Sequence, residues 1–178
     1  LKIVTLEQGK KLVESINDYK HLDILSLVVN FIDILSHTRS ESTILQEMVP
    51  DEAAYRAAVI NWMKNVWFLK VLKEISYWGH TVIITSDHGI IRVKKPVVVK
   101  GDKSTSSGLR SKFGRNLNLS SKHALVIKHP ADYKLPNFDG MTNYLVARGD
   151  YFFVYPNQFH KYTKMFNNSF QHGGISMD

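Results

Sequence analysis

The chain has 178 residues, a hydrophobic fraction of 44%, no cysteine and a net charge of +7. This length and composition favour one domain, or most of one, with enough apolar residues for a core. The missing cysteines exclude disulfides and thiolate metal sites. No apolar run reaches the roughly 18 residues of a transmembrane helix, and no secretory signal opens the sequence. We therefore expect a cytoplasmic protein without membrane contact.

The positive charge is concentrated in the stretch 92–115, which we call the basic stretch. It holds eight Lys or Arg residues and a single acid, Asp102. A field of this sign attracts polyanions such as nucleic acid or phosphorylated small molecules. A solvated basic loop would have the same composition, so the charge alone leaves both interpretations open.

The first half of the chain has the pattern of a parallel sheet flanked by helices. Leu1–Leu6 predicts a strand and Glu7–Asn17 a helix, and the apolar stretch Leu22–Leu35 predicts a strand buried on both faces. After a long crossover, Thr81–Thr85 predicts a second buried strand.

The crossover carries the best helix signal of the chain. Pro50 is followed by two acids, which suit the positive end of a helix dipole. We expect this helix to end near Gly79. Apolar residues spaced by three and four predict its buried face: Tyr55, Val59, Trp62, Val66 and Leu69.

The second half is richer in short strands. Ile90–Lys100 alternates loosely, and a Gly/Ser/Lys loop follows at Gly101–Gly108. Further strands are predicted at His123–His129, Tyr144–Ala147 and Tyr151–Tyr155, with a turn at Arg148-Gly149-Asp150 between the last two. The predicted fold class is α/β, a sheet flanked by helices with a β-rich insertion.

Three short motifs place Asp and His residues at predicted strand ends, where α/β sheets bind ligands. Asp87-His88-Gly89 follows the predicted strand Thr81–Thr85. Asp33 and His37 follow the buried run Leu25–Ile32, and a helical turn there would bring them onto one face. His172 precedes Gly173-Gly174, and paired glycines allow a close approach to a ligand. Taken singly, the motifs are better explained by an ordinary turn or a structural histidine.

Taken together, the three histidines and two aspartates predict a hard or borderline metal bound through nitrogen and oxygen. Five ligands exceed the needs of one tetrahedral zinc ion. A pair of zinc ions that clamps a phosphoryl group would use them.

The chain also resembles the PglZ domain of the alkaline phosphatase superfamily from about Leu1 to its end. The segments that carry the resemblance are Val29-Asn30-Phe31-Ile32-Asp33, Ser36-His37-Thr38-Arg39, Ser86-Asp87-His88-Gly89, Gly101-Asp102 with Leu109-Arg110, Tyr155-Pro156-Asn157, and Phe170-Gln171-His172-Gly173-Gly174-Ile175-Ser176. The sequences of these motifs most resemble those of PglZ domains at the C-terminal end of response regulators of the type IX secretion system.

The resemblance implies an alkaline-phosphatase-like fold and two zinc ions. It assigns Asp33, His37 and His172 to one ion, and Asp87 and His88 to the other. The superfamily also needs a further Asp ligand and a Thr or Ser nucleophile on an earlier strand, and neither has a counterpart here. We therefore expect residues 1–178 to be the C-terminal portion of the catalytic domain and to be inactive alone.

The implied function is a phosphodiesterase or phosphatase domain that acts on nucleotides or oligonucleotides. Charge and loop position make Arg110 and Lys112 candidates for binding substrate phosphates. The resemblance further implies a homodimer, with a receiver domain in the same protein and a sensor kinase as partner. A non-enzymatic, metal-stabilised signalling and dimerisation module is the alternative. A plain nucleic-acid-binding domain explains the basic stretch but not the Asp and His motifs.

Overall fold

The computed structural model describes residues 1–65, 67–101 and 105–175. The chain divides into two compact units, Leu1–Ser86 (unit 1) and Asp87–Asp178 (unit 2), which are described separately. Both combine helices with small sheets, so the predicted α/β class is confirmed. Within the described residues, no helix has both the length and the apolar character needed to cross a membrane.

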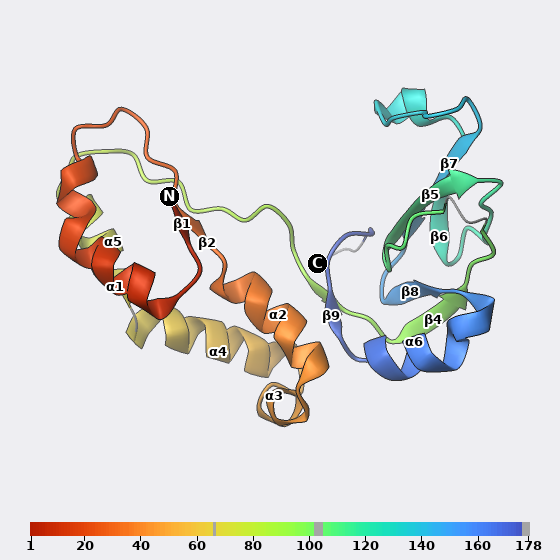
Figure 1. The fold of residues 1–178 in the computed structure, drawn as a ribbon, viewed down its shortest axis with the longest axis horizontal. Helices are drawn as coiled ribbons and strands as arrows, with labels where there is room; N and C mark the ends of the chain where they lie inside the picture. The colour runs from red at the N-terminus through yellow and green to blue at the C-terminus, as the bar shows by residue number, and fades with distance from the viewer. Residues whose placement is uncertain (66, 102–104, 176–178) are drawn as a thin grey trace. The chain divides into compact units, whose positions relative to one another are not determined.

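Unit 1 is mainly helical. Its elements in chain order are β1 (Lys2–Ile3), α1 (Leu6–Ser15), a 3-10 helix (Ile16–Tyr19), β2 (Val28–Val29), α2 (Phe31–Glu41), α3 (Thr43–Met48), α4 (Glu52–Asn65) and α5 (Trp67–Ser76) (Figure 1). The predicted helix at Glu7–Asn17 is confirmed. It begins with a capping box, in which Thr5 and Gln8 satisfy each other's backbone N–H groups.

The parallel strands β1 and β2 position the start of α2. They pair in the register Lys2 with Val28 and Ile3 with Val29, and α1 is the crossover between them. The backbone N–H of Asn30 donates to the carbonyl of Ile3 at 3.1 Å, so the ladder continues to the first turn of α2. This strand-to-helix junction carries Asp33 and His37.

The prediction of one strand over Leu22–Leu35, buried on both faces, is wrong. Only Val28–Val29 pairs with another strand, and from Phe31 the chain is helical. Leu25, Leu27 and Val29 pack against the core, whereas Ile24 is 86% exposed. The side chains before α2 therefore alternate between packed and exposed positions, as in a strand with one buried face.

The prediction of a buried strand at Thr81–Thr85 is also wrong. These residues form no regular secondary structure, and Ile83 and Ile84 are 83% and 67% exposed. A strand requires a hydrogen-bonded neighbour, and no described segment pairs with this one.

The helix predicted after Pro50 forms, and its described residues are those of α4 and α5. Asp51 caps α4, because its carboxylate accepts the N–H of Ala54 at 2.8 Å. Tyr55 is buried as predicted, whereas Leu69 on α5 is exposed and Trp67 and Val71 are buried instead. Val66, which the pattern placed on the same face, lies outside the described residues. The buried face of α5 is therefore not the one that the spacing predicted.

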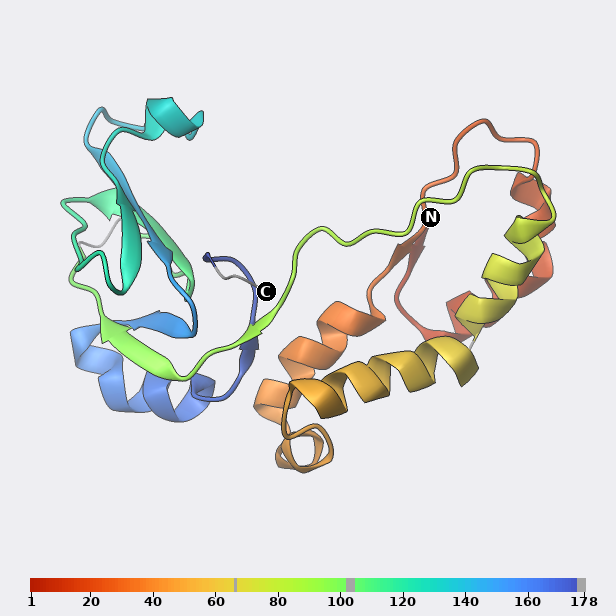
Figure 2. The ribbon, with the colours of Figure 1, turned by 180° about the vertical axis from the view of Figure 1, so that it is seen from behind.

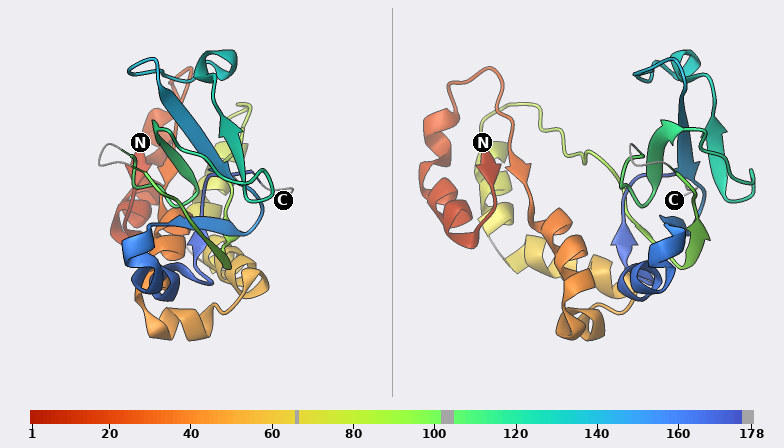
Figure 3. Two further views of the ribbon diagram at one scale, coloured as in Figure 1. Left: turned by 90° about the vertical axis from the view of Figure 1, so that its right-hand side faces the viewer. Right: turned by 45° about the vertical axis from the view of Figure 1, so that its right-hand side comes forward.

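The core of unit 1 lies between α1 and α5, which pack side by side (Figure 3). Its buried members are Ile3, Leu12, Ile16, Trp67 and Val71. The Trp67 ring lies edge-on to Trp62 and Phe68, at centroid distances of 5.9 and 5.8 Å. Gly9 on α1 permits this packing, because a Cβ at that position would overlap the indole of Trp67.

We expect Gly9→Ala to destabilise the protein by about 1–2 kcal/mol. Alanine favours a helix by about 1 kcal/mol over glycine, but overpacking a core typically costs about 1–3 kcal/mol. The measurement is urea unfolding followed by tryptophan fluorescence. Lys10→Ala, on an exposed position of the same helix, is the matched control and should change little. A stabilised Gly9→Ala protein would show that the indole moves away without cost.

Unit 2 contains most of the strands. Its elements in chain order are β3 (Ile91–Arg92), β4 (Lys95–Val98), β5 (Ser111–Arg115), β6 (Ala124–Ile127), a 3-10 helix (Pro130–Tyr133), β7 (Thr142–Ala147), β8 (Tyr151–Val154), a 3-10 helix (Pro156–Gln158), α6 (Phe159–Phe166) and β9 (Phe170–Gln171). The strands predicted within 123–129, 144–147 and 151–155 are confirmed, as is the turn at Arg148-Gly149-Asp150, where Gly149 has φ +46°.

The described residues of unit 2 form three small sheets (Figure 2). The antiparallel sheet has the order β5-β7-β6, β4 pairs with β8 in parallel, and β3 pairs with β9 antiparallel. Strand β8 is buried on both faces: Phe153 joins the core against β6 and β7, while Phe152 and Val154 pack with residues of α6. This strand therefore holds the sheets and α6 together.

Candidate metal-binding site

The first pair of predicted ligands lies on α2 in unit 1. Asp33 and His37 are one helical turn apart, and the Oδ1 of Asp33 is 3.3 Å from the Nε2 of His37. The predicted helical turn that brings them onto one face is confirmed. Two ligands bound to one tetrahedral zinc at about 2.0–2.2 Å are themselves about 3.4 Å apart. The spacing of this pair therefore fits a shared zinc ion.

Neighbouring side chains fix the helix that carries this pair. Arg39 is buried and donates to the carbonyls of Val49 and Pro50, across the turn that leads to α4. The hydroxyl of Tyr55 on α4 donates to the carbonyl of Ile32 at 2.8 Å. Burial, and secondly the negative charge of Asp33, raise the pKa of Tyr55 to about 12, so the phenol remains a donor. The Tyr55 bond anchors the first turn of α2, and the Arg39 bonds anchor its last turn.

The second group of predicted ligands lies in unit 2, where β3 and β9 bring distant parts of the chain together. Ile91 pairs with Gln171, and this antiparallel register sets the residues before β3 beside those after β9. His88 and His172 thereby stack, with ring centroids 4.2 Å apart and planes 23° apart. Their ligand nitrogens lie within 4.8 Å of each other.

The surroundings of His88 suit a metal ligand. Its Nδ1 lies 3.2 Å from the carbonyl of Gly89, and a backbone carbonyl is a common partner of the ring nitrogen that does not bind the metal. Its Nε2 is 3.7 Å from Oδ2 of Asp87, whose carboxylate is largely exposed. One nitrogen and one oxygen can therefore face the same ion.

The pairing of His88 with His172 differs from the ligand sets that the family resemblance implies, which place these residues on separate ions. Ions in two-metal sites lie about 3.5–4 Å apart. Ligands of neighbouring ions then come as close as these two rings, so their distance fits either assignment.

Arg110 has a different position from the one predicted. The sequence suggested a phosphate-binding side chain, but Arg110 is only 2% exposed, and its Nε donates to the carbonyl of Gly173 at 3.0 Å. A Cβ at Gly174, which has φ +87°, would overlap the guanidinium. Arg110 therefore supports the backbone directly after His172. Contact with a substrate phosphate stays a prediction.

Lys112 is likewise buried, with 1% exposure. Its Nζ donates to the carbonyl of Ser106 at 3.0 Å and lies 4.2 Å from the centre of the Tyr155 ring. Burial lowers its pKa to about 8. Neither Arg110 nor Lys112 is therefore exposed, and phosphate binding by Lys112 also stays a prediction.

The basic stretch is correspondingly less available to a polyanion than its composition suggests. Besides the two buried residues, Lys95 pairs with Asp150 at 2.9 Å and Arg115 pairs with Asp139. Asp102 and Lys103 lie outside the described residues, as does Ser176 of the C-terminal motif. Lys94 and Lys100 are exposed. The charge thus serves partly to stabilise unit 2.

We expect the stability of the protein to rise between pH 8 and 9.5 through Lys112. Its folded pKa of about 8 lies below the ordinary 10.5, so in this range the unfolded state binds more protons, and raising the pH favours the folded state. Lys112→Met should lack this rise, whereas the exposed Lys128→Met should retain it. Urea unfolding at several pH values measures both. Identical pH profiles for wild type and Lys112→Met would contradict the buried position.

A scan against protein-family models matches residues 3–178 to the BREX system PglZ alkaline phosphatase-like domain. The chain belongs to the PglZ family. A search of curated proteins found no match. Membership of an alkaline phosphatase-like family suggests a phosphoesterase-type hydrolase, and such domains usually bind metal. The Asp and His pairs of this PglZ chain have suitable donor atoms for such a metal.

Proposed function

We propose that this PglZ domain is a zinc-dependent hydrolase of phosphate esters, and that nucleotides or oligonucleotides are its substrates. The observation that carries the proposal is the stacked pair of His88 and His172. Non-local strand pairing brings these two imidazoles together, and both belong to segments that resemble the metal-binding motifs of the superfamily. A structural role alone gives no reason for two exposed or half-exposed imidazoles to stack.

The proposed ligands follow from the resemblance and fit the local geometry. Asp33 and His37, at 3.3 Å, would hold one ion together with His172. Asp87 and His88 would belong to a second ion. Bound zinc polarises a phosphoryl oxygen and lowers the pKa of a bound water or hydroxyl. The chain's own part is to hold the donors in place, through Arg39 and Tyr55 for α2 and through Arg110 for the loop after His172.

The biological setting is proposed from the resemblance alone. The motifs resemble those of the C-terminal PglZ domain of PorX, a response regulator of type IX secretion. By that analogy the domain would be a cytoplasmic output module that is fused to a receiver domain and has a sensor kinase as partner. It would be active as a homodimer. The nucleophile and a further Asp ligand would come from an earlier segment of the same catalytic domain, so residues 1–178 alone would not turn over substrate.

Zinc binding by the chain itself tests the ligand assignment without requiring turnover. We expect His172→Ala to weaken zinc affinity by about 100-fold or more, because losing even a residue that only orients a ligand costs about 10- to 100-fold. Competition with a chromogenic chelator at pH 7.5 gives the affinity. His129→Ala, an exposed histidine of unit 2, is the control. Equal zinc affinity for wild type and His172→Ala would remove His172 from the site.

A further inference from the structure

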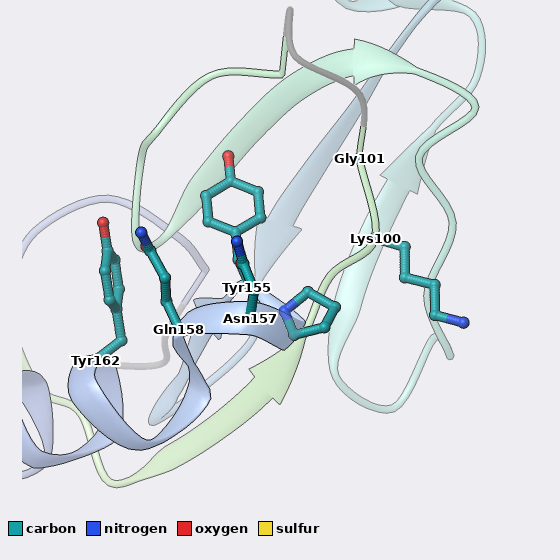
Figure 4. A pocket seen from close by; sticks show the side chains of 7 residues that line it. Lys100, Gly101, Tyr155, Asn157, Gln158 and Tyr162 are labelled. Atoms are coloured by element: carbon teal, nitrogen blue, oxygen red, sulfur yellow. The ribbon is translucent and has the colours of Figure 1, made fainter.

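Unit 2 contains a pocket that none of the predicted metal ligands lines. It lies at the carboxyl ends of the parallel strands β4 and β8 and has a volume of about 630 Å³ (Figure 4). The residues that matter for its chemistry are Lys100, Tyr155, Asn157, Gln158 and Tyr162. The ladder explains their proximity: Val98 pairs with Val154, and the N–H of Val99 donates to the carbonyl of Val154 at 2.9 Å.

The pocket has aromatic and amide groups directed to one side. In Figure 4 the side chains of Tyr155, Gln158 and Tyr162 point in the same direction. Gln158 ends the 3-10 helix before α6, and Tyr162 follows one turn later on α6. The Tyr155 hydroxyl donates to the carbonyl of Ser106 at 3.0 Å, which fixes the orientation of this ring.

A buried cation lies against the Tyr155 ring. The Nζ of Lys112 is 4.2 Å from the ring centre, and the side chain is almost completely buried. Among the described residues, no carboxylate forms an ion pair with it. Lys112 does not line the pocket, so its contact holds the Tyr155 ring in place. Lys100 lines the pocket and is exposed, and it is the cation available to a phosphate there.

We propose that this pocket binds one nucleotide of the substrate, with the base against the Tyr155 and Tyr162 rings and the phosphate near Lys100. The assignment of the ligand as a nucleotide rests on the proposed function. The pocket supplies the groups that nucleotide recognition requires: aromatic rings on which a base stacks, side-chain amides that bond to base edges, and lysine for phosphate. The site would therefore select the substrate by its base.

Binding of mononucleotides under metal-free conditions tests this proposal separately from catalysis. Adenosine 5′-monophosphate and ribose 5-phosphate are titrated into the chain in the presence of EDTA, with isothermal calorimetry as the readout. Adenosine 5′-monophosphate should bind about 10-fold or more tightly than ribose 5-phosphate, because stacking of one base contributes about 1–3 kcal/mol, or about 5- to 150-fold.

Substitutions of pocket residues test whether the nucleotide binds in this pocket. Tyr162→Ala should reduce the affinity for adenosine 5′-monophosphate about 10-fold and leave that for ribose 5-phosphate unchanged, whereas Tyr162→Phe should retain most of the affinity. Lys100→Gln should weaken both ligands. Tyr133→Ala removes an exposed tyrosine elsewhere in unit 2 and should change neither. Circular dichroism checks the fold of each variant.

The two proposals fail in different ways. If the mononucleotide and ribose 5-phosphate bind equally, or if Tyr162→Ala binds the nucleotide as tightly as wild type, the pocket assignment is wrong even when phosphodiesters are hydrolysed. If the nucleotide binds in the predicted manner but the longer protein hydrolyses no phosphate ester with zinc, the pocket assignment holds and the proposed enzymatic function fails.

Discussion

In the longer protein proposed to carry this domain, replacing His88 by alanine should reduce phosphodiester turnover by about 100-fold or more, with the fold preserved. The His88 side chain stacks on His172 outside the hydrophobic core, so its removal costs little packing. As a proposed metal ligand, however, it supports charge stabilisation worth several kcal/mol in the transition state. Each 1.4 kcal/mol corresponds to about tenfold in rate.

The His88→Ala experiment requires three measurements on the same preparation: zinc content, circular dichroism and turnover of a chromogenic phosphodiester. His129→Ala is the matched control, because it removes an exposed histidine of the same unit. We expect low zinc and low turnover only for His88→Ala. Normal turnover in this variant would exclude His88 as a functional ligand, whereas loss of the circular dichroism signal would assign it a structural role.

Trp67→Ala should destabilise unit 1 by about 3–5 kcal/mol, the usual range for removing a buried tryptophan. The indole lies in the middle of the core between α1 and α5, against Trp62, Phe68 and the Cα of Gly9. Hydrogen exchange is a suitable measurement because it reports the stability of each unit separately.

Leu69→Ala is the matched control for Trp67→Ala. Sequence periodicity placed Leu69 on the buried face of one long helix, whereas in the structure it is 51% exposed on α5. We therefore expect a loss below about 1 kcal/mol. A larger loss for Leu69→Ala than for Trp67→Ala would mean that α5 packs through the face that the periodicity predicted.

Local patterns in the sequence predicted well those features that depend on neighbouring residues. The i, i+4 spacing of Asp33 and His37 requires only one helical turn, and that turn forms. The short strands β6, β7 and β8 are similarly bounded by turns that their own residues specify. The α/β class follows from the same kind of information.

Features that depend on pairing between segments far apart in the sequence were not predictable in the same way. The apolar run Val82–Ile84 suits a strand, but forming one requires a partner that no local pattern specifies. The stacking of His88 on His172 depends on the register of β3 against β9. The burial of Arg110 and Lys112 was not predicted. Composition counts charged residues, but it does not show which backbone carbonyls accept their hydrogen bonds.

The dependence of turnover on zinc tests the central claim most directly. The longer protein proposed to carry this domain is stripped with a chelator, dialysed and titrated with zinc. Bound zinc and hydrolysis of a chromogenic phosphodiester are measured together. We predict that stripping abolishes turnover, and that turnover returns with added zinc and reaches its maximum at two ions per chain. Turnover that survives complete removal of metal, or zinc binding at full occupancy without any hydrolysis, would contradict the assignment as a zinc-dependent phosphoesterase.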